Sequence, residues 1–475
     1  MKLKSLIKAL PKELQYMVTN YDPTVLFCIL SKSELTEYDW FKLIRMNFSL
    51  CYQRDECTNE EIMEVYLNEC YNGNKSMIFQ GEYYTIVRLN ECTLMSSGYN
   101  YVGQLGLGDH RDRYGFQKIS GINIPIVEVA CGKDFIVIRL MDGTLMGCGC
   151  NESGQLGFGD YKNRNKFEEI KNIGKNIVEV KCAYSYTIIR FGDGILMGCG
   201  SNEHGQLGLG DRLKRNVFEK IDSVPKNIVE VISGTFNVIV RLTDGTLMAT
   251  GYNDHGELGL GDKRNRYGFV KVGGIGKNIA KVFTGCCNTA ILLTDGTLLV
   301  SGYNQYGQLG LGDKRDRMSF EKITGIPKNI RKVVWSQYHA FIILTNGTLM
   351  GCGFNSSGQL GLGDHECLCF FEEVKGVPKN IEEVTTRNSH TIIRLMDGKL
   401  MSCGSNVNGE LGLGDFIGRK SFEGIKGVPK NISEVVFPMY GTLIRLTDGT
   451  MMGCGCNIEE LGFGDYVKRN VFTKL

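Results

Sequence analysis

The residues of this chain whose pattern could bind a charged ligand stand in eight glycine-rich segments. The segments read Gln-Leu-Gly-Leu-Gly-Asp or a close variant, and they end at Asp109, Asp160, Asp211, Asp262, Asp313, Asp364, Asp415 and Asp465. Glycine-rich loops can hold phosphate groups, but the phosphate-binding loop of nucleotide enzymes ends in Gly-Lys-Ser or Gly-Lys-Thr before a helix. None of the eight segments has that ending. We therefore interpret them as structural loops.

An arginine follows seven of these aspartates at a distance of four residues. These arginines are Arg113, Arg164, Arg215, Arg266, Arg317, Arg419 and Arg469, and the sixth copy has Leu368 instead. Further basic residues crowd the same segments, among them Lys162, Lys214, Lys263 and Lys314. If equivalent positions lie on one face, they form a basic ring that could bind a nucleic acid or an acidic partner. The alternative is that each arginine pairs with a carboxylate of its own loop.

The residues that could bind a metal or catalyse a reaction form less specific patterns than the basic residues do. Cys-x-Cys pairs occur at Cys148/Cys150, Cys367/Cys369 and Cys454/Cys456, but zinc sites favour two to four intervening residues. His339 and His390 occupy the same position in successive copies, where other copies have Tyr, Phe or Asn. A position that accepts such variety indicates packing. We predict no metal site, no cofactor and no enzymatic activity.

The loops recur at a fixed period, which determines the elements that must position them. Of the seven intervals between the aspartates, six are 51 residues and the last is 50. In each copy an asparagine precedes the loop, at Asn100, Asn151, Asn202, Asn253, Asn304, Asn355, Asn406 and Asn457. A period of this length is typical of repeat architectures.

Within the second copy the apolar segments predict four strands, at Ile126–Ala130, Phe135–Leu140, Thr144–Cys148 and Phe167–Ile170. Asp142-Gly143 between the second and third segments is a strong hairpin signal. An Asp-Gly or Asn-Gly turn recurs in every copy except the first, which has Asn90-Glu91-Cys92.

Four strands per repeat describe one blade of a propeller. We predict an all-β propeller over residues 76–475 with eight four-stranded blades, behind a small α-helical module at residues 1–75. The alternative is a ring of seven blades with a terminal copy outside it. The last strand, Phe472–Leu475, is expected to complete either the last blade or the first one.

The pattern Gly-x-Asn-x-x-Gly-Gln-Leu-Gly-x-Gly-Asp at Gly149–Asp160 resembles the repeat of the regulator-of-chromosome-condensation family. The resemblance covers about residues 77–475 and implies a propeller. The sequence departs from the family in two ways. The family usually closes seven blades, whereas this chain has eight units. The last copy has also lost one residue and a loop glycine, and it reads Asn457-Ile-Glu-Glu-Leu461.

Residues 1–75 carry no repeat and predict helices. Pro11 and Pro23 suit helix starts, and Thr58 with Glu61 forms a capping box. The predicted apolar stripes consist of Leu14, Met17, Val18 and Tyr21, and of Phe41, Ile44 and Phe48.

The run Leu10-Pro11-Lys12-Glu13-Leu14, followed by Asp22-Pro23, resembles an F-box. That resemblance implies docking to the adaptor of a cullin-type ubiquitin ligase. The residues that match are Pro11, Leu14, Val18, Leu26 and Ile29. The alternative is a small helical cap on the propeller.

The composition of the chain narrows the classes of protein to which it could belong. The chain has 54 Lys and Arg against 52 Asp and Glu, which does not favour a protein built around bulk nucleic-acid binding. Five of the 18 cysteines recur at one repeat position, Met1–Leu10 lacks the apolar run of a signal peptide, and no 18-residue apolar stretch occurs. We expect a reduced intracellular protein with buried thiols and no membrane span.

These patterns favour a non-enzymatic protein-interaction propeller that recruits a client to a ubiquitin ligase. An F-box-like start joined to such repeats also resembles proteins of large DNA viruses that infect amoebae. The alternative is therefore a self-assembling structural component of a virus particle or genome-packaging fibre, located in the host cytoplasm, the nucleus or the virion. Guanine-nucleotide exchange is a weaker alternative, because uniform repeats leave no room for the inserted wedge that this activity uses.

The two tryptophans predict the absence of a light response. Plant ultraviolet receptors of the resembling family use clustered tryptophans, whereas this chain has only Trp40 and Trp335. We expect the assembly state to be the same in the dark and under ultraviolet light when measured by size-exclusion chromatography. A light-dependent change would contradict this prediction.

Overall fold

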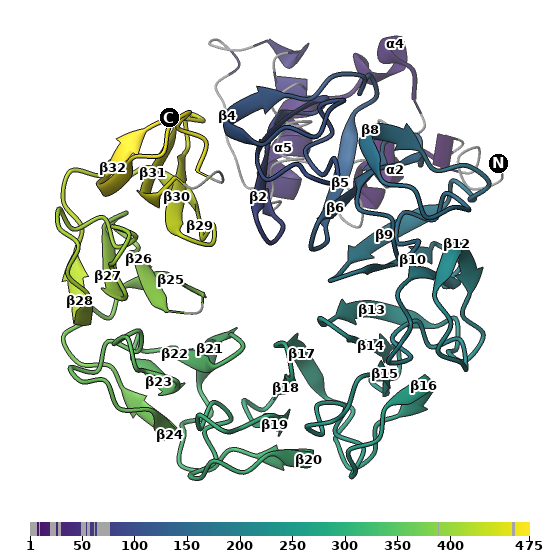
Figure 1. Cartoon of the computed structure of the whole chain (residues 1–475). Helices are drawn as coiled ribbons and strands as arrows, with labels where there is room; N and C mark the ends of the chain where they lie inside the picture. Colours follow the sequence, from purple (N-terminus) through teal and green to yellow (C-terminus); the bar gives the residue numbers. More distant parts are fainter. Residues whose placement is uncertain are drawn as a thin grey trace. The chain divides into compact units, whose positions relative to one another are not determined.

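The computed structural model describes residues 7–8, 10–19, 25–26, 30–48, 54, 58–60, 62–63, 77–387, 389–457 and 461–475. The chain separates into two compact units, Met1–Met77 and Ile78–Leu475. In the described ranges the first unit is helical and the second consists of strands (Figure 1). Within these ranges, no helix is both long and apolar enough to cross a membrane.

The helical unit contains α2 (Lys12–Val18), α4 (Lys32–Leu35) and α5 (Trp40–Phe48) among its described residues. Its core consists of Tyr16, Leu26, Leu35, Tyr38, Trp40, Leu43, Ile62 and Met63. At the start of α4 the Ser31 hydroxyl accepts from the Glu34 N–H, and the Glu34 carboxylate accepts from the Ser31 N–H. This capping box satisfies two backbone donors that the helix itself leaves free.

The apolar stripe predicted for α2 is wrong. Gln15 and Tyr16 are buried, whereas Leu14 and Met17 are 44% and 56% exposed. The Gln15 amide donates to the Leu10 carbonyl at 2.8 Å, and the Tyr16 ring packs edge-on against Tyr38 with centroids 5.7 Å apart. A glutamine with internal partners can therefore occupy the buried face. Tyr21, Asp22, Pro23, Ile29, Glu61 and the side chains of Ile44 and Phe48 lie outside the described residues.

The strands of the second unit form eight four-stranded antiparallel sheets in the described residues, each built from four consecutive strands. The predicted eight-blade propeller is confirmed, and Figure 1 shows the blades arranged as a ring. In chain order the blades are β1 (Ile78–Gln80), β2 (Tyr84–Asn90), β3 (Thr93–Gly98), β4 (Arg113–Lys118); β5 (Ile126–Cys131), β6 (Phe135–Leu140), β7 (Leu145–Gly149), β8 (Arg164–Glu169); β9 (Ile177–Cys182), β10 (Tyr186–Phe191), β11 (Leu196–Gly200), β12 (Arg215–Lys220); β13 (Ile228–Ser233), β14 (Asn237–Leu242), β15 (Leu247–Gly251), β16 (Arg266–Lys271); β17 (Ile279–Thr284), β18 (Asn288–Leu293), β19 (Leu298–Gly302), β20 (Arg317–Lys322); β21 (Ile330–Trp335), β22 (His339–Leu344), β23 (Leu349–Gly353), β24 (Leu368–Glu373); β25 (Ile381–Arg387), β26 (His390–Leu395), β27 (Leu400–Gly404), β28 (Arg419–Gly424); and β29 (Ile432–Val436), β30 (Gly441–Leu446), β31 (Met451–Cys456), β32 (Lys468–Lys474).

The predicted strands of the second copy agree with β5, β6 and β7 to within one residue. The fourth was expected at Phe167–Ile170, but β8 begins three residues earlier, at Arg164. Its first residue, Arg164, pairs with Gly149 beyond a register shift between Gly147 and Gly149. A β-bulge of this kind leaves no hydrophobic alternation that a sequence could display.

The second strand of each blade is buried on both of its faces. In β6, Ile136 and Ile138 join a cluster with Tyr84 of blade 1, whereas Phe135 and Val137 join a cluster with Ile189 of blade 3. Successive side chains of a strand point to opposite faces of its sheet. Each blade therefore buries one apolar face against the preceding blade and one against the following blade.

Cysteines at one position of the third strand contribute to these interfaces. Cys148, Cys199, Cys352, Cys403 and Cys454 are fully buried, and burial raises the pKa of each thiol. The prediction of buried thiols at this repeat position is confirmed.

Each glycine-rich loop forms a hydrogen bond to the blade that follows it. A loop glycine N–H donates to a backbone carbonyl in the fourth strand of the next blade, with N–O distances between 2.6 and 2.8 Å. The donors and acceptors are Gly108 and Asn165, Gly159 and Asn216, Gly210 and Tyr267, Gly261 and Met318, Gly312 and Cys369, Gly363 and Lys420, Gly414 and Asn470, and Gly464 and Tyr114.

The last of these pairs closes the ring between blades 8 and 1. Gly115 and Phe463 also form a β-bridge there, and the rings of Tyr114 and Tyr466 lie 4.4 Å apart. The C-terminal strand β32 pairs with β31 of its own blade. The expectation that it could complete the first blade instead is therefore wrong, because the loop contact makes a strand exchange unnecessary.

A second loop glycine permits the close packing of neighbouring blades. Gly361 has φ +71°, and a Cβ at this position would lie within 3.0 Å of the Phe422 ring in the next blade. Gly376, in the linker after blade 6, has a similar φ of +77° but no atom within 4 Å of an added Cβ. A substitution at Gly376 strains only the left-handed backbone, whereas a substitution at Gly361 also creates a steric clash with Phe422. Comparing the two therefore measures the cost of the clash alone.

We predict that Gly361→Ala lowers the free energy of unfolding more than Gly376→Ala. Both variants strain a positive φ, but only the first forces a methyl group against Phe422, and overpacking costs roughly 1–3 kcal/mol. Thermal melting of the two purified variants measures the difference. Equal melting temperatures would contradict the role assigned to the loop glycine.

Candidate functional site

The two ends of the strands define two faces of the propeller. Because neighbouring strands are antiparallel, the turn after the first strand and the loop after the third strand lie at the same end. In blade 4 the N–H of Tyr252, after β15, donates to the carbonyl of Phe236, before β14, at 2.9 Å. We call this side the loop face. The opposite side, which carries the Asp-Gly turns, is the hairpin face.

The recurring asparagine holds each loop on this face in shape. In blade 3 the Asn202 Oδ1 accepts from the Leu207 N–H and its Nδ2 donates to the Asp211 carbonyl, both at 3.0 Å. Blades 1, 2 and 4 to 7 repeat both bonds, through Asn100, Asn151, Asn253, Asn304, Asn355 and Asn406. One side chain thus ties together the two ends of the glycine-rich loop.

The seven arginines of the predicted basic ring lie against the aspartates of their own loops. The N–O distances are between 2.6 and 3.0 Å, and the arginine side chains are only 13–23% exposed. Their hydrogen bonds lower the pKa of Asp109, Asp160, Asp211, Asp262, Asp313, Asp415 and Asp465. Each arginine therefore contributes an internal ion pair that braces its loop.

The four predicted lysines have exposed side chains in the loops of blades 2 to 5. Lys214 lies 4.3 Å above the Tyr161 ring, and Lys263 Nζ lies 3.3 Å from Asp316. The lysines of blades 2 and 5 are Lys162 and Lys314. At this place blade 6 has the acidic sequence Asp364-His365-Glu366. The lysines therefore follow an arc over four blades.

A second arc on the loop face is aromatic, and sequence analysis did not find it. Its members are Tyr184, His204, Phe236, Tyr252, His255, Tyr303, Tyr306, Tyr338 and Phe354. We call these nine residues the aromatic arc. Neighbouring rings along it have centroids between 4.8 and 6.3 Å apart, within the range of favourable aromatic contacts.

The aromatic arc comes from three segments of the repeat in blades 3 to 6. Tyr184, Phe236 and Tyr338 stand in the turn after the first strand. Three more precede the recurring asparagine, and three follow it by two residues. Tyr184 is exposed, and the other eight rings are partly exposed. The signal was present in the sequence, but it becomes visible only when equivalent positions of successive repeats are compared.

Glu257 is a buried carboxyl beside this arc. It is fully buried, its Oε2 accepts from the His255 N–H at 3.0 Å, and its Oε1 lacks a hydrogen-bond partner in the described residues. Burial raises the pKa of Glu257 to about 8. Five other copies have glutamine here; in blade 5 the Gln308 Nε2 donates to the Gln337 carbonyl at 3.4 Å. A deprotonated Glu257 has no hydrogen to donate in this way.

The two predicted packing histidines are buried in interfaces between blades. Burial lowers the pKa of His339 to about 4 and that of His390 to about 3. His390 Nε2 lies 3.3 Å from the Thr442 hydroxyl of blade 8. Across the described ranges, no group of three or more His, Cys, Asp and Glu side chains has the arrangement of a metal site.

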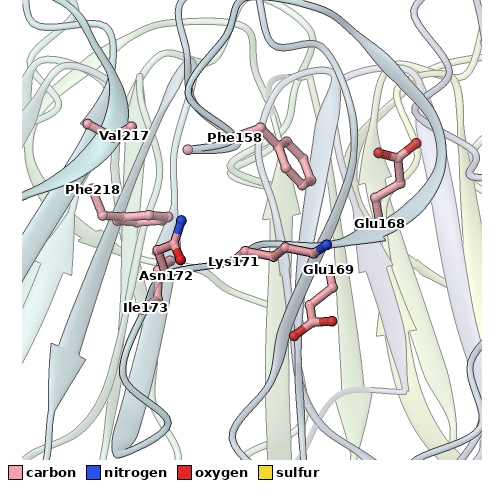
Figure 2. Close-up of a pocket in the computed structure, with 9 residues that line it drawn as sticks. Phe158, Glu168, Glu169, Lys171, Asn172, Ile173, Val217 and Phe218 are labelled. Carbon is pink, nitrogen blue, oxygen red and sulfur yellow. The ribbon is translucent and has the colours of Figure 1, made fainter.

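A cavity of about 360 Å³ opens between the loop of blade 2 and the fourth strand of blade 3. Figure 2 shows Phe158, Lys171, Asn172 and Phe218 among its lining residues. Glu168, which also lines it, is paired with Arg164 at 3.1 Å. Asn172 has φ 62° in a linker where five other copies have glycine. These polar groups do not converge on one point, so the cavity is a weaker candidate than the aromatic arc.

Comparisons with known proteins identify the repeat. The family description "Regulator of chromosome condensation (RCC1) repeat" matches residues 126–155 and 330–359 in one form and residues 142–189 and 295–343 in another. The chain is 29% identical to the ultraviolet-B receptor UVR8 of Arabidopsis thaliana over 350 residues, which is 72% of this chain and 80% of the receptor.

Two further relatives differ in how much of their length is matched. The chain is 30% identical to the human probable E3 ubiquitin-protein ligase HERC4 over 68% of its own length, but only 32% of HERC4 is covered. It is 24% identical to the regulator of chromosome condensation of Xenopus laevis, with 68% of this chain and 81% of that protein covered.

Solved structures agree on the fold. Human WBSCR16 superposes with a TM-score of 0.56 at 18% identity, covering 72% of this chain and 96% of that one. Yeast RCC1 (Prp20), solved with Kap60 bound to it, superposes with a TM-score of 0.57 at 16% identity, covering 77% and 90%.

We predict that Glu257→Gln stabilises the protein, and does so more at high pH. Because the pKa of Glu257 is about 8 in the folded state, against 4.5 ordinarily, stability is lost as the pH rises from about 4.5 to about 8. The loss is on the order of a few kcal/mol, since one pKa unit corresponds to about 1.4 kcal/mol. Melting curves at pH 5 and pH 9 measure it.

Glu410→Gln is the matched control. Glu410 occupies the same repeat position, but its two carboxylate oxygens accept from the Ser405 hydroxyl and the Asn408 N–H. We expect that variant to lose one of these two partnered oxygens and so not to gain the stability that Glu257→Gln gains. A gain for Glu257→Gln that is the same at pH 5 and pH 9 would contradict the assignment.

Proposed function

We propose that this chain, a propeller of regulator of chromosome condensation repeats, is a non-enzymatic interaction protein that binds a partner protein on its loop face. The observation that carries the proposal is the aromatic arc across blades 3 to 6. Aromatic side chains are enriched where proteins bind one another, because they combine a large apolar area with few rotatable bonds. A rigid ring of blades presents them without a further cost of ordering.

The charges beside the aromatic arc indicate the kind of partner. The exposed Lys162, Lys214, Lys263 and Lys314 stand in loops of blades 2 to 5, three of which also contribute to the arc. The loop arginines are largely buried in ion pairs with their own aspartates, whereas the four lysine side chains are exposed, with Lys263 within 3.3 Å of Asp316. A partner with apolar side chains and acidic residues fits both features, and complementary charge speeds its association.

Binding through the aromatic arc predicts that a double variant, Phe236→Ser with Tyr338→Ser, releases the partner. Both side chains stand in turns on the loop face, so their loss removes apolar contact area without touching the strands. Met396→Ser is the control, because Met396 is 61% exposed beside an Asp-Gly turn of the hairpin face. Affinity purification of the intact chain and of each variant from the same cells measures the difference.

Retention of the same partners by the double variant would contradict a site on the loop face. Their loss from the Met396→Ser control alone would place binding on the hairpin face instead.

For the helical unit we propose that it docks the adaptor of a ubiquitin ligase and so links the bound client to that enzyme. The exposed Pro11, Leu14 and Met17 on and before α2 support this, since an adaptor-binding helix must offer apolar side chains to solvent. Leu26 is fully buried in the unit's own core and is therefore not a docking residue. Val18 is half-buried. HERC4, a relative of which 32% matches this chain, is a probable E3 ubiquitin-protein ligase.

Docking through α2 predicts that Leu14→Glu with Met17→Glu abolishes adaptor capture and leaves propeller melting unchanged. The two charges would lie on the exposed side of α2, where they cost little folding energy but oppose an apolar contact. Glu13→Gln, an exposed change on the same helix, is the control. Pull-down of the adaptor with each variant measures the effect.

The same variants test the alternative of a structural assembly component. If the double variant instead dissolves an oligomer of the intact chain in size-exclusion chromatography, and no adaptor is captured by the unaltered protein, the assembly function replaces the adaptor function.

A further inference from the structure

The loop-face ends of the first strands in blades 7, 8 and 1 line a second cavity of about 360 Å³. Figure 1 shows β25 and β29 on the inner side of the ring, so this cavity lies on that side. We call it the inner cavity. A volume of this size falls within the range of small-molecule sites, roughly 300–1,000 Å³. Its lining residues include Gln80, Thr385, Thr386, Arg387, Val436 and Phe437.

Arg387 stands at a repeat position where the other copies have no charged side chain. In blade 1 a Cβ at this position, on Gly81, would lie 1.9 Å from the Tyr84 ring. In blade 7, by contrast, β25 continues to Arg387, which pairs with His390. Packing of a blade therefore does not require an arginine here. The other seven copies have Gly81, Gly132, Ala183, Gly234, Gly285, Ser336 and Pro438.

Contacts with the two neighbouring blades determine the direction of the side chains at the end of β25. The Thr386 hydroxyl is hydrogen-bonded to Nε2 of His339 in blade 6. Because successive side chains of a strand point to opposite faces, Thr385 and Arg387 face blade 8. There the Arg387 guanidinium donates to the Phe437 carbonyl. This bond holds the guanidinium at the wall of the inner cavity.

The inner cavity has a positive lining. Arg387 is the one charged side chain among the described residues that line it. Burial and the nearby Arg387 lower the pKa of His390 to about 3, so that ring is neutral at pH 7. Glu82, the residue after Gly81, is paired with Lys133 at 3.1 Å. The charge of the lining therefore favours an anion.

Gln80 provides an independent observation at the same cavity. Its Nε2 is shielded from solvent and has no hydrogen-bond partner in the described residues. A buried donor without a partner is unfavourable. Rotation of the amide toward the inner cavity would give this donor a partner when an acceptor oxygen is bound there. The repeat itself does not require an amide, since the other copies have Cys131, Cys182, Ser233, Thr284, Trp335, Thr386 and Phe437.

An apolar wall lies beside these polar groups. Val436 and Phe437 line the inner cavity from blade 8, and the centroids of the Phe437 and His390 rings lie 4.3 Å apart. An inorganic anion would gain nothing from such a wall. A carboxylate on a short apolar chain fits both parts of the lining, because the planar guanidinium matches the geometry of a carboxylate.

We propose that the inner cavity binds the carboxylate of a ligand that carries a short, branched apolar chain. The carboxylate accepts hydrogen bonds from the Arg387 guanidinium and the Gln80 amide, and the apolar chain lies against Val436 and Phe437. A free acid and the C-terminus of a peptide both supply this chemistry. The site is separate from the aromatic arc and does not depend on the partner proposed for the loop face.

Saturation-transfer NMR of the intact chain with 3-methylbutanoate at pH 7 tests the site. We expect transfer to the methyl groups of this acid and none to 3-methylbutanamide, which has the same shape without the charge. Arg387→Met should weaken binding at least about tenfold, since hydrogen bonds to charged groups contribute at least that factor. Arg331→Met is the matched control, because Arg331 also donates to a carbonyl of the next blade, that of Ile381, but does not line the inner cavity.

Gln80→Leu separates a binding role from a structural one. The variant removes the donor that lacks a partner, so the melting temperature should stay the same or rise while binding of 3-methylbutanoate weakens several-fold. A lower melting temperature with unchanged binding would show that the amide serves the fold alone. Melting curves of all three variants confirm that folded proteins are compared.

Two tripeptides that end in leucine, one with a free carboxylate and one amidated, distinguish the sources of the ligand. Tighter binding of the free-carboxylate peptide than of 3-methylbutanoate indicates the end of a partner chain, and binding of 3-methylbutanoate alone indicates a free acid. Absence of transfer to every carboxylate, or equal binding by the unaltered protein and Arg387→Met, would overturn the proposal. Purified protein suffices for these measurements, so their outcome is independent of partner capture on the loop face.

Discussion

The hydrogen bond from a loop glycine to the fourth strand of the following blade is the contact on which the ring depends. It occurs at every junction, including the one between blade 8 and blade 1, where Gly464 donates to the Tyr114 carbonyl. Because each blade is built from one repeat, the chain ends need not share a sheet. Closure then requires only that the last loop meet the first blade as every other loop meets its neighbour, and the bond from Gly464 to Tyr114 provides that contact.

The same loops explain how blades with nearly identical backbones can present different side chains on the loop face. The asparagine bonds and the arginine–aspartate pairs hold each loop by contacts within its own repeat. Side chains next to these residues are then free to differ from blade to blade. The aromatic arc and Glu257 both occupy such positions, and both lie on the loop face. Side chains can therefore vary there without changing the bonds that hold each loop.

The fold was largely predictable, and the candidate site was not. The Asp-Gly turns and the apolar second strands are local patterns, so the predicted β6 agrees with the structure. The start of β8 at Arg164 was missed because a register shift, not an apolar alternation, sets it. The exposed Leu14 and buried Gln15 of α2 were missed because the partners of Gln15 lie outside the helix. The predicted arginines proved to be paired, and the aromatic arc was absent from the prediction.

The sequence by itself determined the number of repeats, the four strands in each and the positions of their turns. These features follow from backbone preferences and from contacts within about 50 residues, which a period of 51 residues repeats along the chain. Only the tertiary structure decided that eight blades close, that β32 stays in its own blade, and which side chains meet on the loop face. The reason is physical: His255 meets Tyr303 and Asp316 across a boundary between blades, and such contacts depend on how one repeat packs against the next.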